Sequence, residues 1–198
     1  MKKALSLTLA LCSLLSLCAC AASRGPNAAG TPELPEQYRL DDAEHLWQVR
    51  SSNPVEEDFA QGLHAFAAQT ASALLAGKGE NACYSPVSLY FALSLAAYGA
   101  KGETRDELDR ALRTEGKGDE YLAAQVSALF KQLYQTNGVN LYNSLWLKAG
   151  HPFAQDYLDA AVSNWFATLY SVDFSQDSTG KAVDKWVRTA SNDKLSFS

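Results

Sequence analysis

The chain contains 198 residues, of which 47% are hydrophobic and 20% are charged, and it carries a formal net charge of −5. This composition is sufficient to build a buried core and excludes a chain that is disordered throughout. No cluster of Lys and Arg offers a surface for nucleic acid, so we expect no nucleic-acid partner.

The first 19 residues, MKKALSLTLALCSLLSLCA, differ from the rest of the chain. They begin with Met and two lysines, continue with small and apolar residues, and contain no acidic residue. A charged start followed by an apolar stretch is typical of a signal peptide, and the stretch is short for a transmembrane helix. We therefore predict that residues 1–19 are a signal peptide and that the protein is exported.

The segment Leu17-Cys18-Ala19-Cys20 resembles a bacterial lipobox, in which a small residue precedes the cysteine that is acylated. The pattern predicts Cys20 as the lipid attachment site, with the protein anchored at the bacterial cell surface. Cys18 is the weaker candidate because bulky Leu17 would precede the cut. Several acyl chains would anchor the protein firmly, whereas one chain binds only marginally. The alternative is a plain secretory signal cleaved near Ala22, which would release an extracellular protein.

The cysteines give a further constraint on an exported protein. Cys12 and Cys18 leave with the predicted signal and Cys20 is acylated, so Cys83 remains alone. One thiol cannot form an internal disulfide framework, and stability must come from packing. Removal of the two lysines of the signal leaves 15 basic residues against 22 acidic ones, a net charge of −7.

Residues 20–40 are rich in Ala, Gly and Pro and show no apolar period. This composition predicts a flexible tether between the anchor and a domain that occupies residues 41–198. At the start of that domain, residues 40–52 carry Leu46, Trp47 and Val49, which indicate a short packed segment of unassigned structure.

The first clear helix signal is Asn53-Pro54-Val55-Glu56, which combines a capping residue, a proline at the first helical position and a glutamate three residues after the cap. Apolar residues then recur at steps of three and four as far as Leu74, and Gly77 and Gly79 end the helix. His64 has no second histidine or cysteine near it in sequence, so we expect no metal site there.

Residues 81–104 read NACYSPVSLYFALSLAAYGAKGET and contain a long apolar run with almost no polar side. Ser85 is a suitable cap and Pro86 fits the first helical turn. Gly99 and Gly102 would let the chain leave the helix and turn tightly. The pattern predicts a helix that lies inside the body of the protein.

The remaining elements complete an α+β order. Thr104 to Glu107 repeat the capping pattern at the start of a short helix, and the apolar period changes to a strand pattern in VNLYNSLWLK. Most of the helices precede the first strand, which gives no support to a βαβ nucleotide-binding fold. The expected later elements are a helix at 118–135, a strand at 139–148, a helix at about 153–168, a strand at 170–174 and a helix at about 178–190.

Catalytic and ligand-binding signatures are missing from the sequence. It contains no glycine-rich phosphate loop, no closely spaced pair of metal ligands and no Gly-x-Ser-x-Gly elbow. We therefore expect no enzyme, no metal and no cofactor. Ser85 and Ser88 are the nucleophiles that a hydrolase would use, but neither has a histidine nearby in sequence, and a capping role explains Ser85 without chemistry.

Residues 81–104 also strongly resemble the serpin family, whose pattern is Asn, three residues, Ser-Pro-x-Ser, an apolar run and Gly-Ala-x-Gly-x-Thr. The matching residues are Asn81, Ser85, Pro86, Ser88, Gly99, Ala100, Gly102 and Thr104. Three further segments, 143–147, 170–174 and 183–195, are similar to later family segments in the same order. Asp184 in place of asparagine and the lack of a glycine before Lys194 are mild departures.

The resemblance implies a serpin-like α+β fold, with N-terminal helices packed on part of a large mixed or antiparallel sheet. It also implies an inhibitor of serine or cysteine proteases, which offers an exposed loop for cleavage and then inserts that loop as a strand into its own sheet. Ser85 and Ser88 would lie in the shutter beneath the moving strands. A whole serpin needs about as much sequence again, so we expect an N-terminal half without the reactive-centre loop that is not inhibitory by itself.

Three functions follow from these observations. The leading one is a bacterial lipoprotein of the serpin family that inhibits a protease in its full-length form. The second is a non-inhibitory cell-surface binding lipoprotein, or a serpin remnant, that holds a partner along an unfilled sheet edge. The third is a hydrolase that uses Ser85 or Ser88.

Overall fold

The computed structural model describes residues 28–77, 79, 82–136 and 139–196. The predicted signal peptide, Cys20 and Asn81 lie outside the described residues. The elements in chain order are β1 (Ala28–Gly30), α2 (Ala43–Ser52), α3 (Glu57–Leu75), α4 (Pro86–Gly99), α5 (Gly102–Leu112), α6 (Gly118–Gln135), β2 (Asn143–Lys148), α7 (Gln155–Ser163), β3 (Ala167–Val172) and α8 (Asp177–Ala190).

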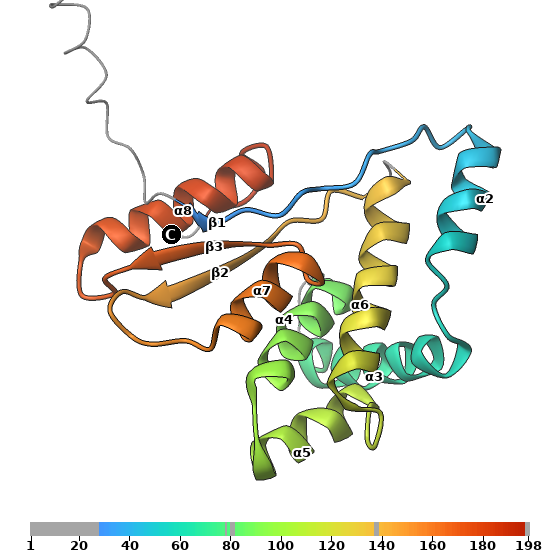
Figure 1. Ribbon diagram of the computed structural model, residues 1–198, viewed down its shortest axis with the longest axis horizontal. Coiled ribbons are helices and arrows are strands. Elements are labelled where there is room, and N and C mark those ends of the chain that lie inside the picture. The colour runs from blue at the N-terminus through green and yellow to red at the C-terminus, as the bar shows by residue number, and fades with distance from the viewer. Residues whose placement is uncertain (1–27, 78, 80–81, 137–138, 197–198) are drawn as a thin grey trace, which may run out of the picture.

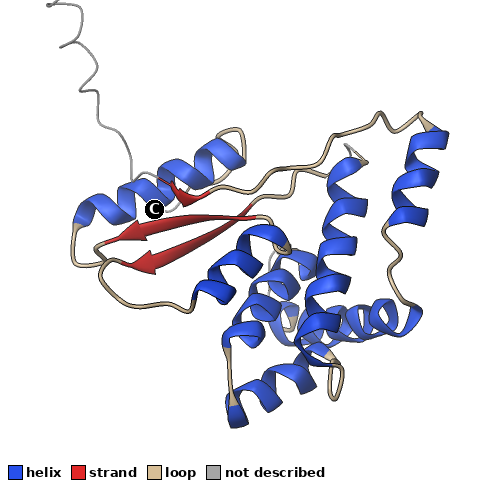
Figure 2. Cartoon of the chain, in the orientation of Figure 1, coloured by secondary structure: helices blue, strands red, loops and turns tan. Residues whose placement is uncertain are grey.

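Helices α2 to α6 form one side of the molecule and the strands form the other, with α7 between them and α8 alongside the sheet (Figure 1). Figure 2 shows the strands gathered in a single sheet. The strand order is β1-β3-β2, in which β2 and β3 are parallel and β1 is antiparallel to β3. The fold is therefore α+β with a mixed sheet, as the sequence predicts.

Strands β2 and β3 are connected through α7. Parallel strands cannot be joined by a tight hairpin, so the chain crosses over through this helix before it returns as β3. The pairing runs from Asn143 opposite Ala167 to Lys148 opposite Val172. The sequence predicts both strands but not their parallel pairing, and β2 begins at Asn143 instead of residue 139.

Helix α4 lies at the centre of the core and contacts α3, α5, α6 and α7. Its Tyr90, Phe91 and Ala97 side chains are at most 1% exposed. The prediction of a helix inside the body is correct for this side. It is wrong for the opposite side, where Ala92 and Ala96 are exposed.

Two predicted helix starts are displaced. Helix α3 begins at Glu57, because Asn53 instead ends α2: its backbone N–H and its Nδ2 both donate to the carbonyl of Val49, at 3.1 and 2.9 Å. Helix α5 begins at Gly102, so Thr104 lies inside the first turn and does not cap the helix. Local capping patterns do not show which of two adjoining helices a polar residue serves.

The helix predicted at about 153–168 is too long at both ends. Helix α7 begins at Gln155 and ends at Ser163, and β3 already begins at Ala167. Phe166 between them has a φ of +51°, outside the helical range. Its ring stacks on Phe130 of α6 with centroids 4.2 Å apart. This contact with a distant helix ends α7 earlier than the local pattern predicts. By contrast, α6 and α8 lie within one residue of their predicted bounds.

The described part of the predicted tether contacts the rest of the fold. Residues 28–30 form β1, and the Tyr38 N–H donates to the carbonyl of Gln135 at 2.7 Å. The structure therefore differs from the expectation of a flexible tether at these positions. The unassigned segment 40–52 contains α2, which Asp42 caps by accepting a hydrogen bond from the His45 N–H at 3.2 Å.

Candidate functional site at the open face of α4

One side of α4 is open and is built from small residues. Its exposed positions recur at steps of three and four, which places them in one stripe along the helix. The exposed residues of this stripe are Ser85, Ser88, Ala92, Ala96 and Gly99. Small side chains fill little space, and hollows lie against both ends of the stripe. We treat this face as the candidate functional site.

The larger hollow lies between the first turn of α4, the residues that lead into β2 and the end of α8. It has a volume of about 640 Å³, and Ser88, Tyr142 and Trp186 line it together with residues 190–192, 194 and 195. A second hollow of about 250 Å³ adjoins it and extends to Phe91, Leu95 and Trp165. Lys194 is the one charged residue among the described residues that line either hollow. We call these two hollows the α4 groove; its wall combines apolar side chains with hydroxyl and amide groups, as binding sites do.

The two serines of the predicted site are hydrogen-bonded to each other. Ser85 Oγ accepts from the Ser88 N–H at 3.2 Å, so Ser85 caps α4 as predicted, and Ser88 Oγ donates to Ser85 Oγ at 3.0 Å. Within the described residues neither hydroxyl bonds to a histidine or a carboxylate. The geometry provides no general base for a serine nucleophile.

The other predicted site residues are divided between the two ends of α4. Pro86 occupies the first turn of the helix, as predicted. Gly102 has a φ of +59°, which is the left-handed conformation that glycine adopts readily. Gly102 and Thr104 line neither part of the α4 groove. The structure thus brings Ser88, to which Ser85 is hydrogen-bonded, together with Tyr142 and Trp186, but not with Thr104.

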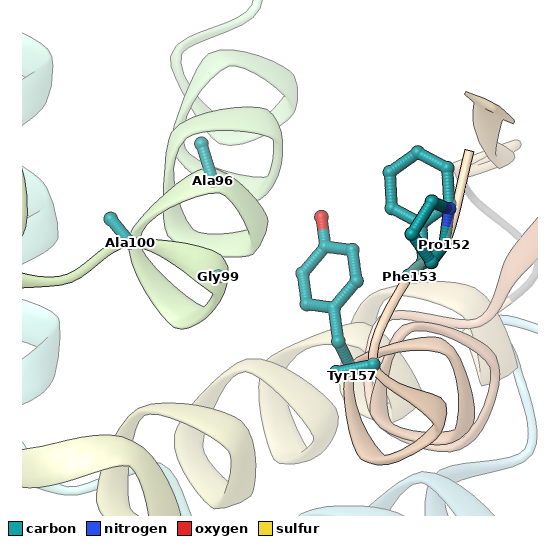
Figure 3. A pocket seen from close by; sticks show the side chains of 7 residues that line it. Ala96, Gly99, Ala100, Pro152, Phe153 and Tyr157 are labelled. Atoms are coloured by element: carbon teal, nitrogen blue, oxygen red, sulfur yellow. The ribbon is translucent and has the colours of Figure 1, made fainter. Parts of the chain in front are cut away.

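Gly99 lies at a separate shallow hollow of about 400 Å³ at the C-terminal end of α4. Figure 3 shows the ring of Tyr157 standing between Gly99 and the Pro152–Phe153 segment. A Cβ atom on Gly99 would lie 2.9 Å from Cε2 of Tyr157, so the reason for a glycine here is this close approach and not a turn. Burial raises the pKa of Tyr157, so its hydroxyl stays protonated.

A buried hydrogen-bond chain beneath the groove is absent from the sequence predictions. Trp165 Nε1 donates to Ser94 Oγ at 2.8 Å, and Ser94 Oγ donates to the carbonyl of Phe91 at 2.9 Å. Asn143 Nδ2 donates to the carbonyl of Trp165 at 2.6 Å. This chain connects α4, β2 and the residues before β3. The sequence signal was a serine inside an apolar run, together with a tryptophan whose N–H needs an acceptor when buried.

The described residues contain no group of three or more His, Cys, Asp or Glu side chains that could hold a metal ion. A helix long and apolar enough to cross a membrane is also absent from the described part of the chain. The site consists of small hydroxyls, apolar rings and amides, which suits binding of another polypeptide better than acid-base chemistry.

Comparison with known proteins identifies the family. The family model described as serpin (serine protease inhibitor) matches residues 61–196, which include α4, the sheet strands β2 and β3, and the α4 groove. The chain belongs to the serpin family. The resemblance seen in residues 81–104 and in the three later segments is confirmed at the level of family and fold.

Individual serpins show the extent of the likeness. The chain is 33% identical over 139 residues to a putative serpin-Z8 of Oryza sativa subsp. japonica, which covers 65% of this chain and 32% of that protein. It is 28% identical over 137 residues to Serpin B11 of Homo sapiens, covering 59% and 35%. The chain spans about a third of the length of these serpins.

Solved serpin structures share the fold at lower identity. Serpin48 of the insect Tenebrio molitor superposes with a TM-score of 0.63 at 23% identity, covering 71% of this chain and 39% of that one. Ovalbumin from emu, Dromaius novaehollandiae, gives a TM-score of 0.60 at 18% identity, covering 70% and 41%. Membership of a family of protease inhibitors is consistent with a protein that is not an enzyme.

Proposed function

We propose that this chain supplies the helical body and part of the sheet of a serpin-type inhibitor of a serine or cysteine protease. The observation that carries the proposal is the family match over residues 61–196. The matched serpins are about three times as long as the matched stretch, so the inhibitory act belongs to a full-length form. In that form a reactive-centre loop is cleaved and inserted as an added strand.

The α4 groove supports this proposal by its position and shape. It lies beside β2, which is the strand at one edge of the sheet, and its floor is the small-residue face of α4. Strands that shift across such a floor meet few side chains that obstruct them. The Ser85 and Ser88 hydroxyls, which now bond to each other, can exchange partners with passing backbone groups. This is the shutter role we propose for the two serines.

The test is incubation with a panel of serine and cysteine proteases, followed by denaturing electrophoresis. We expect an SDS-stable covalent complex from a version extended to the length of its relatives, and none from residues 1–198 alone. A stable complex formed by the 198-residue chain would contradict the second expectation. Failure of the extended form with every protease of the panel would favour a non-inhibitory protein.

We also propose that the protein is a bacterial lipoprotein acylated at Cys20 and held at the cell surface. The support is the lysine-led apolar start and the Leu17-Cys18-Ala19-Cys20 pattern. In a bacterial host, Cys20→Ser should release the protein from the membrane fraction and abolish incorporation of labelled fatty acid. The matched control Cys18→Ser should remain in the membrane fraction and should still incorporate labelled fatty acid. Retention of label in Cys20→Ser would overturn the assignment.

The volume of the α4 groove favours a second candidate, a non-inhibitory binding module. A hollow of about 640 Å³ with an apolar wall can take several side chains of an extended segment. This function predicts that the extended protein binds a partner reversibly and forms no covalent protease complex. The same electrophoresis experiment therefore distinguishes the two candidates.

A further inference from the structure

The segment before α3 lies outside the stretch that the family model matches, yet it is part of the fold. Residues 28–52 precede residue 61, where the family match begins. In Figure 1 this segment leaves the sheet at β1, passes the end of α6 and continues into α2. It therefore connects the two sides of the molecule at its surface.

At the sheet, β1 covers the outer edge of β3. Ala28 lies opposite Tyr170 and Gly30 opposite Leu169, in antiparallel pairing. A Cβ atom on Gly30 would lie 3.1 Å from Leu169 Cδ1 and 3.3 Å from Val162 Cγ2. The backbone of β1 is thus packed closely against both β3 and α7, and a side chain at position 30 would require Leu169 and Val162 to shift.

At the helical side, the same segment donates hydrogen bonds to backbone carbonyls at the C-terminal end of α6. The carbonyls of a last helical turn have no partner within their own helix. The Tyr38 N–H donates to the Gln135 carbonyl at 2.7 Å, and Gln37 Nε2 donates to the Tyr134 carbonyl at 3.1 Å. The ring of Tyr38 also stacks on His45 of α2, with centroids 4.7 Å apart.

We propose that residues 28–42 form a brace that ties the outer edge of the sheet to the end of α6 and closes that edge against other strands. Exposed strand edges pair readily with other chains, and a short covering strand is one way to prevent this. Within the described sheet, the brace leaves β2, beside the α4 groove, as the edge without a partner strand.

The brace is tested by amide hydrogen exchange of Gly30→Val in the full 198-residue chain. The valine should displace β1 and speed exchange about tenfold in residues 167–172, since backbone hydrogen bonds across the edge are lost. Exchange at Tyr38 should also rise, because both ends belong to one segment. The matched control is Gly180→Val in α8, where a Cβ would have no neighbour within 4 Å. Unchanged exchange in residues 167–172 would overturn the proposal.

A second variant distinguishes loss of the brace from general unfolding. Tyr38→Pro removes the N–H that bonds to Gln135 and leaves the Gly30 contact untouched. The brace predicts faster exchange in residues 167–172 with unchanged exchange in α4. Faster exchange confined to the end of α6 would show that the two contacts are independent, which also overturns the proposal. Neither experiment uses a protease, so the result is separate from the test of inhibition.

Discussion

Trp165 is 1% exposed, and its indole N–H has Ser94 Oγ as acceptor beneath the α4 groove. Trp165→Phe removes this buried hydrogen bond and part of the ring volume. We expect the free energy of unfolding in urea to fall by about 2 kcal/mol. The control Trp47→Phe changes a side chain that is 69% exposed and should have little effect. Equal losses in both variants would show that the Ser94 contact does not stabilise the fold.

Tyr90 provides a prediction for alkaline pH. Its hydroxyl donates to the Leu112 carbonyl at 3.1 Å, and burial raises its pKa above the ordinary value of 10.0. The unfolded state therefore ionises first, and the stability from Tyr90 is present below pH 10 and is lost as the pH rises above it. The free energy of unfolding of Tyr90→Phe should be about 1 kcal/mol lower than that of wild type at pH 7. Between pH 9 and 11 it should decline less than that of wild type.

The measurement for Tyr90 is urea unfolding at a series of pH values. Tyr142→Phe is the matched control, because Tyr142 is 45% exposed. It should follow the wild-type pH dependence. Parallel declines of wild type and Tyr90→Phe at high pH would contradict the prediction.

Individual residues were predictable where their role is local. Ser85 caps α4 and Pro86 occupies its first turn, and both roles follow from neighbours in the sequence. Gly99 was predicted for the wrong reason: it makes room for Tyr157, which lies 58 positions later in the chain. No local pattern could show that contact, because it depends on how α7 packs against α4.

At the scale of elements, Arg105 joins three helices. Its Nε donates to Asp109 at 2.8 Å within α5, and its Nη1 donates to Asp119 of α6 and, at 3.2 Å, to the Ala97 carbonyl of α4. Its side chain is 14% exposed, so removal leaves two carboxylates poorly compensated. Arg105→Met should lower the free energy of unfolding by about 2 kcal/mol.

The matched control for Arg105→Met is Arg110→Met on the same helix. Arg110 is exposed and donates to the backbone carbonyl of Asp106. It should change stability by less than about 0.5 kcal/mol. If the two variants lose the same stability in urea, the contacts of Arg105 between helices contribute nothing beyond a surface charge.

Elements were predicted best where the apolar periodicity extends over many residues and where no neighbouring element or distant side chain determines the ends. Helix α6 was predicted at its observed bounds, whereas α3 and α5 were displaced and α7 was predicted too long. The displaced ends lie where two elements adjoin, as at Asn53, or where a distant ring holds the chain, as at Phe166. The competition is decided by tertiary contacts, which a local pattern does not contain.

At the scale of the whole molecule, the open face of α4 provides a test of the proposed shutter. Ala92 is exposed, so Ala92→Trp should change the stability of this chain by no more than about 0.5 kcal/mol. In a version extended to the length of its relatives, the new ring would obstruct strands that move over α4. We expect the yield of the SDS-stable protease complex to fall to a small fraction of wild type.

The control for Ala92→Trp is Ala124→Trp, at an exposed position of α6 that lies outside the α4 groove. This variant should trap protease as wild type does. Normal trapping by Ala92→Trp would show that no strand passes over this face, and it would remove the groove from the proposed mechanism while leaving the family assignment intact.

The sequence by itself determined the family, the α+β class and the order of most elements, because apolar periods, caps and the residues 81–104 are local features of the chain. Only the tertiary structure decided that β2 and β3 are parallel, that one side of α4 is open, and that residues 28–42 span the sheet and α6. These features depend on contacts between residues far apart in the chain. The free energy of such contacts comes from packing of the whole fold, so it cannot be predicted from any short segment of the sequence.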